Sequence, residues 1–199
     1  DMEKMVVSNN VAVLGSGVAA AKATGLGPLI YTNANHGAGG STVAHTSGVA
    51  SVAPTAGTAR AFSKTIYDAA VQATYISAGK VPKAVYMSPA HKALASTFTG
   101  IASNRYEVKG TNQGAIIGGA DVYVSDFGAM THVPHYMMAG STLVYGLDLS
   151  EIKMAYLRPF FSQKLGASGD SVKEQVIVDV TLRLEAEKAC FKIADLSGG

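Results

Sequence analysis

The fold is decided by a stretch near the C-terminal end, residues 168–196, which reads SGDSVKEQVIVDVTLRLEAEKACFKIADL. Apolar side chains occupy every second position in its middle, at Val176, Val178, Val180, Leu182 and Leu184. This period of two predicts a long β-strand that is buried on one face. A buried face needs a facing layer, so we expect other parts of the chain to cover this strand.

The composition is that of a globular protein with little charge. The 199 residues are 48% hydrophobic and 15% charged, and they include 22 glycines but no tryptophan. Abundant glycine favours strands, turns and irregular connections over helical bundles. The formal net charge of +2 comes from scattered basic residues, which argues against a nucleic-acid groove.

A single cysteine, Cys190, excludes an internal disulfide framework and a thiolate metal cluster. It follows an alanine and precedes a phenylalanine, so we expect it to be buried. The sequence shows no signal peptide, and its apolar runs are broken well before membrane-spanning length. We therefore expect a soluble protein that is not exported.

One glycine-rich segment invites a nucleotide-binding interpretation. Gly15 to Ala20 reads GSGVAA after a short apolar run, which matches the G-x-G-x-x-A pattern of dinucleotide-binding turns. The acidic residue expected about 20 positions later is missing, because Asn33, Asn35 and His36 stand there. A glycine-punctuated connection is the plainer interpretation.

Other motifs for chemistry are weak. His36 and His45 lie in a Gly-, Ser- and Thr-rich stretch without a carboxylate between them, which favours solvated or interface histidines over a metal site. His132 and His135 are three apart on an extended segment, so their side chains should diverge. No nucleophile motif is present. The acidic residues near the C-terminus are expected on the exposed face of the long strand: Glu174, Asp179, Glu185 and Glu187. We expect no catalytic, cofactor-binding or metal-binding residues.

The remaining patterns predict an α+β fold. A helix is expected from Ala59 to about Ala78, with Thr58 as cap and Gly79 as its end. A strand at 84–87 and a second helix opened by Ser88 and Pro89 should follow. The first ten residues resemble the last turns of a helix, and residues 33–58 should form a long surface loop. Further expected elements are a loop at 100–112 and strands at 115–117, 121–127, around 130–134, around 142–148 and from 152 to about 160, with a last short strand after Lys188.

From Asp121 onward, the sequence resembles the C-terminal half of a tailed-bacteriophage major capsid protein of the Hong Kong 97 type. The similarity is carried by the order and spacing of several features. These are Tyr123 with Asp126-Phe127-Gly128 before a hairpin, Leu157-Arg158-Pro159, the turn from Gly166 to Asp170, and the long strand with its short successor ending at Leu196. The first half resembles the family more loosely, from the end of its spine helix at residues 1–10 to a helix, strand and helix at 59–98.

The resemblance implies a Hong Kong 97-like fold with axial and peripheral domains, a long C-terminal strand and the end of a spine helix. Residues 1–55 would belong to the peripheral domain, residues 56–150 to the axial domain, and residues 151–199 would return to the peripheral domain. The family's N-terminal arm, its extended loop and most of its spine helix would precede Asp1, so we expect either that these parts are missing from this chain or that the numbering begins inside the subunit. Strands of that N-terminal portion would then be the natural partners of the long strand.

The implied function is structural and not enzymatic: copies of the chain would form hexamers and pentamers of an icosahedral shell around double-stranded DNA. Scaffolding, portal and decoration proteins would be further partners, DNA would be contacted non-specifically, and no membrane would be involved. The protein would reside in the virion after assembly in the host cytoplasm. Two alternatives remain: a nucleotide-binding enzyme that uses Gly15 to Ala20, and a phage tail or receptor-binding module.

The assignment of strand faces gives a test. Val178→Asp would place a charge on the buried face and should abolish folding or assembly, whereas Thr181→Asp on the other face should be milder.

Overall fold

A computed structural model describes residues 6–16, 18, 21–45, 49–50, 52–98, 121–166, 169 and 172–199. Its helices are α2 (Leu26–Leu29), α3 (Lys64–Ala78) and α4 (Pro89–Ala95), with short 3₁₀ turns at Tyr136–Met138, Leu149–Glu151 and Glu187–Ala189. Its strands are β1 (Ala34–Asn35), β2 (Arg60–Ala61), β3 (Ala84–Met87), β4 (Val122–Ser125), β5 (Gly128–Pro134), β6 (Val144–Leu147), β7 (Ile152–Lys164), β8 (Glu174–Leu184), β9 (Phe191–Ile193) and β10 (Leu196–Ser197). The expected α+β class is confirmed.

A mixed six-stranded sheet forms the centre of the body, in the order β1-β9-β6-β3-β5-β4. Two pairs in this sheet are parallel, β1 with β9 and β3 with β5, and the others are antiparallel. The central pairing of β6 with β9 requires a glycine at position 146, because a Cβ there would lie 2.1 Å from the ring of Phe191. β9, close to the C-terminal end, is thus inserted between β1 and β6.

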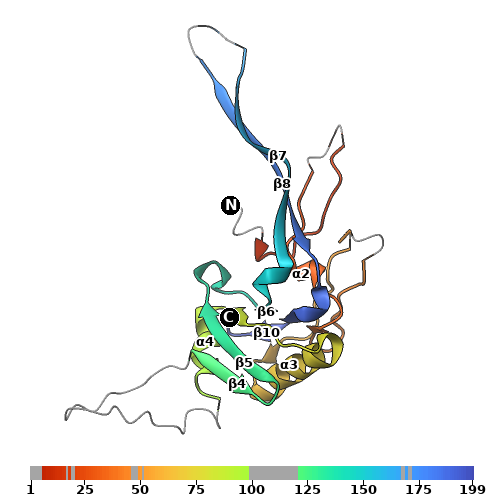
Figure 1. The fold of residues 1–199 in the computed structure, drawn as a ribbon, viewed down its shortest axis with the longest axis vertical. Coiled ribbons are helices and arrows are strands. Elements are labelled where there is room, and N and C mark those ends of the chain that lie inside the picture. Colours follow the sequence, from red (N-terminus) through yellow and green to blue (C-terminus); the bar gives the residue numbers. More distant parts are fainter. Residues whose placement is uncertain are drawn as a thin grey trace, which may run out of the picture.

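Alternating side chains give this sheet two packed faces. On one face, Val85, Val144 and Phe191 pack with α3 and α4, in a core cluster that also contains Tyr67 and Val71. On the other face, Tyr145, Leu147 and Cys190 pack with α2, together with Leu182 and Leu184 of β8. The body thus has a layer of helices on one side and α2 with irregular chain on the other (Figure 1).

The helix predicted from Ala59 begins later. Ser63 is its N-cap, accepting a hydrogen bond from the Ile66 N–H, and Gly79 ends it in the left-handed conformation with φ of 69°. The prediction of Thr58 as the cap was wrong because residues 60–61 form β2 and pair with β10. The end at Gly79 is confirmed.

Several other predicted elements are confirmed. β3 coincides with the predicted strand at 84–87, and Ser88 caps α4, whose first residue is Pro89. β4 and β5 form the expected hairpin, with a turn at Gly128, and β6 and β9 supply the predicted later strands. The loop at 100–112 and the strand at 115–117 lie outside the described residues. So does most of the predicted N-terminal helix, of which Val6 is described and helical.

The last two long strands leave the body as a separate ribbon. β7 pairs with β8 in an antiparallel two-stranded sheet that extends far from the six-stranded sheet (Figure 1). β7 is longer than predicted, since it continues to Lys164. The partner of the long strand is therefore β7 of the same chain.

The expectation of a covered face on β8 is wrong for most of the strand. Leu182 is buried and Leu184 packs on the body, whereas Val178 and Val180 are half-buried and Val176 is 72% exposed. In the part of the chain that the structure describes, no layer covers the strand beyond Leu182. The alternation correctly identified the apolar face, but alternation carries no information about what covers that face.

Candidate functional site: an exposed apolar ribbon and the pocket at its base

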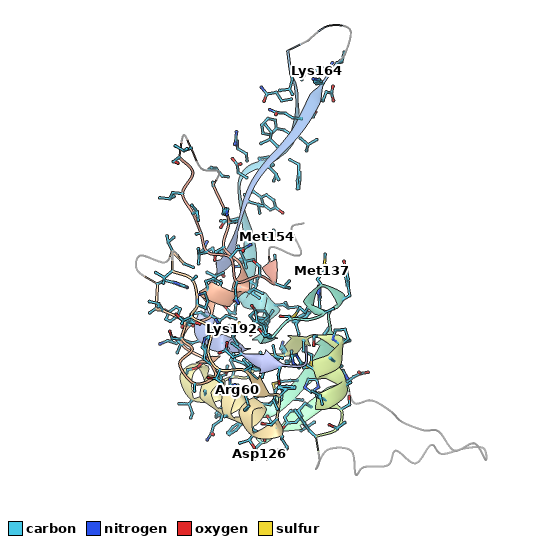
Figure 2. The ribbon with its side chains drawn as sticks, turned by 180° about the vertical axis from the view of Figure 1, so that it is seen from behind. Arg60, Asp126, Met137, Met154, Lys164 and Lys192 are labelled. Atoms are coloured by element: carbon cyan, nitrogen blue, oxygen red, sulfur yellow. The ribbon has the colours of Figure 1, made fainter. Side chains whose placement is uncertain are left out.

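The ribbon carries a continuous apolar face. The register places Met154 opposite Leu182 and Tyr156 opposite Val180, so the apolar side chains of both strands share one side. We call this side the apolar face, and its members are Ile152, Met154, Tyr156, Val176, Val178, Val180, Leu182 and Leu184. Figure 2 shows the ribbon rising from Met154 near its base to Lys164 near its tip. Large exposed apolar surfaces mark places where another macromolecule binds.

Two β-bulges interrupt β7. The register shifts by one residue between Tyr156 and Arg158 and again between Arg158 and Phe161. Bulges redirect side chains and can accommodate a proline, which has no N–H to donate, and Pro159 lies at the second one. At these bulges Leu157 is 85% exposed and Phe160 is 59% exposed. The ribbon therefore presents two large apolar side chains to the outside.

Charged pairs lie on the opposite side of the ribbon. Arg158 donates to Asp179 across the strands, and Glu185 accepts from Lys153 and lies 3.3 Å from Arg183. Exposed ion pairs contribute little to stability. This side is not wholly polar, because Phe161 and Ile177 lie opposite each other on it, farther toward the tip.

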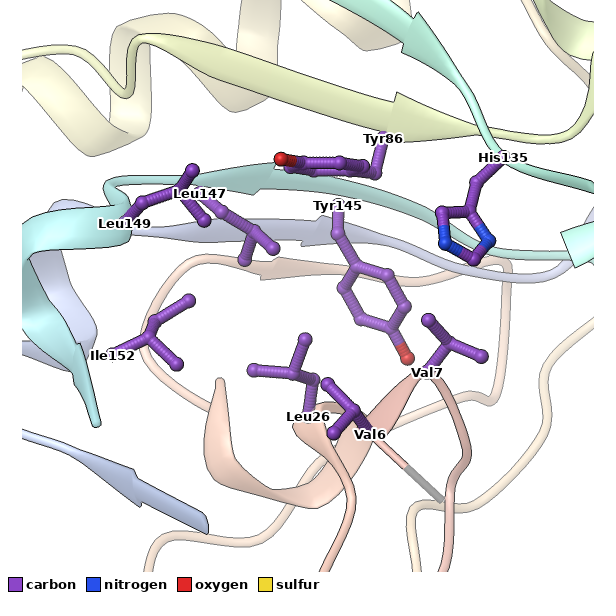
Figure 3. A pocket seen from close by; sticks show the side chains of 9 residues that line it. All are labelled: Val6, Val7, Leu26, Tyr86, His135, Tyr145, Leu147, Leu149 and Ile152. Atoms are coloured by element: carbon purple, nitrogen blue, oxygen red, sulfur yellow. The ribbon is translucent and has the colours of Figure 1, made fainter. Parts of the chain in front are cut away.

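A pocket opens where the ribbon joins the body (Figure 3). Its volume is about 210 Å³, and it is lined by Val6, Val7, Leu26, Tyr86, His135, Tyr145, Leu147, Leu149 and Ile152. Ile152 also begins the apolar face, so the pocket and the face are continuous. Tyr145 is fully buried, and its hydroxyl has no hydrogen-bond partner among the described residues. Burial raises the pKa of this phenol well above its usual range.

His36 and His45 have different neighbours. His36 is bonded to Asp195 and Thr42, while the ring of His45 packs edge-on against Tyr31. The described residues contain no group of three or more His, Cys, Asp or Glu side chains arranged to hold a metal ion.

The predicted divergence of His132 and His135 is confirmed. His132 Nε2 lies 2.9 Å from the Tyr67 hydroxyl on the helix-covered side of the sheet, whereas His135 lines the pocket. The desolvation of His132, aided by the charge of Lys92, lowers its pKa to about 4. The two side chains therefore lie on opposite sides of the sheet.

The Gly15 to Ala20 segment lacks the context of a nucleotide-binding turn. Val13 and Lys22, on either side of it, pair with each other as an antiparallel bridge, so the chain doubles back. The first helix described after the segment is the four-residue α2. Gly17, Ala19 and Ala20 lie outside the described residues. The described flanks therefore give the nucleotide alternative no support.

Cys190 is buried, as predicted, and burial raises the pKa of its thiol to about 11. The expected exposed acids lie beside polar neighbours: Glu174 lies opposite Lys164 in the ribbon, and Glu187 accepts from the N–H and hydroxyl of Thr32.

None of the helices among the described residues is long and apolar enough to cross a membrane.

Sequence reasoning missed two groups of residues. Lys192 is completely buried in β9, and Asp195 adopts a left-handed backbone conformation with φ of 59°. The signal for Lys192 was a lysine between Phe191 and Ile193 in an otherwise apolar segment. The bulges at Leu157 and near Pro159 were indicated only by a proline within a strand pattern.

Comparison with known proteins gives one clear finding. The family model described as SU10 major capsid protein matches residues 1–197. No curated protein matches the chain. The family match thus spans both the six-stranded body and the exposed ribbon.

Proposed function

The chain belongs to the SU10 major capsid protein family, and we propose that it builds its shell as hexamers and pentamers with the exposed ribbon as a contact between subunits. It is a structural phage protein and belongs in the virion. The single observation that carries this is the family match across nearly the whole chain. The exposed apolar ribbon agrees with it, since a subunit that assembles needs apolar surface outside its own core.

The proposed architecture is the Hong Kong 97 type. Residues 56–150 would form the axial domain around the capsomer axis, and residues 1–55 and 151–199 would form the peripheral domain. α3 and strands β3–β6 come from the central segment, while β1 and β9 join the same sheet from the flanking segments. The ribbon comes from the last segment.

In this arrangement the peripheral ribbon contacts neighbours and the axial body contacts copies around the capsomer axis. Heterologous contacts of this kind close into rings when the rotation between subunits closes. Packaged double-stranded DNA would be contacted without sequence preference, and scaffolding, portal and decoration proteins would be additional partners. Assembly would take place in the host cytoplasm.

Negative-stain electron microscopy of the expressed full-length protein tests the proposal. We expect capsomer rings or closed shells in which five and six subunits surround the capsomer axes. A stable monomer at high protein concentration, or trimers or tubes typical of a tail module, would contradict it. Purified particles subjected to three-dimensional reconstruction would show whether residues 56–150 surround the axis.

A further inference from the structure

Asp195 joins the two ends of a long surface loop. Its carboxylate oxygen Oδ2 accepts a hydrogen bond of 3.0 Å from the Gly37 N–H, and the carboxylate accepts another from the Gly57 N–H, twenty residues later. Its backbone C=O accepts from the Arg60 N–H at 2.8 Å. We call residues 36–42 and 55–58 the neck of this loop. One side chain therefore bonds both sides of the neck.

The neck is built for this close approach. A Cβ at position 40 would lie 2.7 Å from Asp195 Oδ2, and one at position 57 would lie 2.8 Å from it, so both positions need glycine. Ser41 and Thr55 exchange backbone hydrogen bonds across the neck, and Thr58 donates to the Ala38 C=O. The left-handed backbone of Asp195 is uncommon outside glycine, and its several partners hold it there.

A relay of side chains continues from Asp195 into the body. His36 Nδ1 lies 3.2 Å from Asp195 Oδ2, and His36 Nε2 lies 2.7 Å from Thr42 Oγ1. Thr42 Oγ1 also accepts from Lys192 Nζ at 2.7 Å, and Lys192 donates a further bond to the Gly27 C=O. Figure 2 places Lys192 in the body below the ribbon.

The partners fix the protonation of His36. The ionised carboxylate of Asp195 can only accept, so Nδ1 carries the proton. Nε2 is then free to accept from the Thr42 hydroxyl, whose oxygen accepts from Lys192. A second proton on His36 would bind to Nε2. Nε2 would then be a hydrogen-bond donor and could no longer accept from the Thr42 hydroxyl.

The surrounding charges oppose this second proton. The groups that act on His36 are Lys192, Arg60 and Asp195, and the side chains of His36 and Asp195 are only 8% and 9% exposed. Desolvation first, and then the charge of Lys192, lower the pKa of His36 below its usual 6.5, although Asp195 works in the other direction. The closed neck therefore binds fewer protons than the open neck, and acid favours opening.

We propose that Asp195, His36, Thr42 and Lys192 form a proton-operated clasp, which holds the neck closed while His36 is neutral and releases it when His36 is protonated. This inference goes beyond the proposed function and does not depend on shell formation. The closed neck is favoured above about pH 6.5 and loses stability as the pH falls below that value.

Hydrogen–deuterium exchange of the full-length protein at pH 7.5 and 5.0 tests the clasp. The observed amides are those of Gly40, Ser41, Thr55 and Thr58, and protection factors corrected for intrinsic rate are compared with those of β6 in the same sample. We expect protection in the neck to fall several-fold more than protection in β6. Neck protection that changes no more than that of β6 would overturn the proposal.

Two variants separate titration of His36 from other effects of acid. His36→Asn keeps a donor toward Asp195 but cannot titrate, so its neck protection should no longer depend on pH. His45→Gln changes a histidine of the same loop outside the clasp and should behave like the unchanged protein. A pH response in His36→Asn equal to that of the unchanged protein would overturn the assignment.

A third variant covers the case in which His36→Asn does not fold. Thr42→Val removes the hydroxyl between His36 and Lys192 while nearly keeping the side-chain shape. Its neck amides should lose protection already at pH 7.5, with β6 unaffected. Unchanged neck protection in Thr42→Val would refute the relay.

Discussion

His132 shows how one buried side chain couples this protein to pH. Its side chain lies against Tyr67 and Tyr123, close to the helix-covered core, and it is only 5% exposed. Burial keeps it neutral, since a charged imidazole would lose its hydration there. At the same scale the sequence revealed less than the structure, because it predicted that His132 and His135 diverge but not which of them is buried.

We predict that acid destabilises the fold through His132. The pKa of about 4 in the folded chain lies below the usual 6.5, so the unfolded chain binds the proton more tightly. The contribution is fully present above pH 6.5 and is lost as the pH falls toward 4. Between pH 7.5 and 5.0 the free energy of unfolding should fall by about 2 kcal/mol from this residue alone.

Urea unfolding at the two pH values measures this effect. His132→Gln should show a smaller difference between pH 7.5 and 5.0 than the unchanged protein, whereas His135→Gln, on the other side of the sheet, should keep it. Equal differences in the unchanged protein and His132→Gln would show that the acid sensitivity arises elsewhere.

Other residues could be predicted where one local rule decides. Gly79 and Ser88 follow from the chemistry of helix ends, and the burial of Cys190 follows from its apolar neighbours. Lys192 could not be predicted, because its partners Gly27 and Thr42 are distant in the sequence. A buried lysine requires such partners, and its pKa falls to about 8 through desolvation.

At the scale of elements, the ribbon separates two kinds of apolar position. Leu182 is buried at the base within the core cluster around α2, while Val178 on the same face is only half-buried. Thr181 lies on the opposite side and is exposed. The alternating pattern predicts that Val178→Asp abolishes folding or assembly. Because Val178 is only half-buried, the effect on folding and the effect on assembly must be considered separately.

We predict three different outcomes for a new aspartate on β8. Leu182→Asp buries a charge without a partner and should lower the free energy of unfolding of the free subunit by several kcal/mol. A loss of that size is comparable to the total stability of a small domain. Val178→Asp should leave the subunit folded but impair assembly, and Thr181→Asp should affect both least.

Circular dichroism with urea reports on folding, and particle yield after expression reports on assembly. Equal behaviour of Val178→Asp and Thr181→Asp in both measurements would mean that the apolar face makes no contact in the shell. An unfolded Val178→Asp subunit would show that the face is already covered within the free chain.

Elements with local signals were predicted best. The strand β3, the helix α4 and the hairpin of β4 and β5 each carry their own turn or cap residues. The start of α3 was missed because Thr58 and Ser63 are both good caps, and only the pairing of β2 with the distant β10 decides between them. Contacts that connect remote parts of the chain leave no local pattern.

At the scale of the whole molecule, apolar surface is divided between a packed body and an exposed ribbon. The body is closed by two core clusters, one on each face of the six-stranded sheet. The ribbon touches the body at its base, where Ile152 and Leu184 pack on the second cluster. The sequence predicted the family and the α+β class, but a single chain's pattern could not show that its longest strands point away from the core.

We predict that the side chains at the bulges act in assembly. Leu157→Ser combined with Phe160→Ser should leave the unfolding curve of the subunit nearly unchanged, because both side chains are largely exposed. The same double variant should reduce the yield of particles seen by electron microscopy at least about tenfold. This estimate assumes that each contact between subunits loses about 1.4 kcal/mol, which is a factor of ten in its association constant.

The matched control changes two exposed polar residues of the same ribbon, Gln163→Ser and Gln175→Ser, which lie opposite each other. This variant should assemble normally. Normal particles from the double variant at Leu157 and Phe160 would exclude the bulges from the subunit contacts.

The two bulges also give the ribbon spare length. β7 uses 13 residues to span the distance that β8 spans with 11, with one extra residue at each of the two register shifts. Removing Leu157 would eliminate one bulge while Arg158 still faces Asp179 and the tip keeps its register. A deletion at either bulge can therefore be absorbed locally, without moving either end of the ribbon.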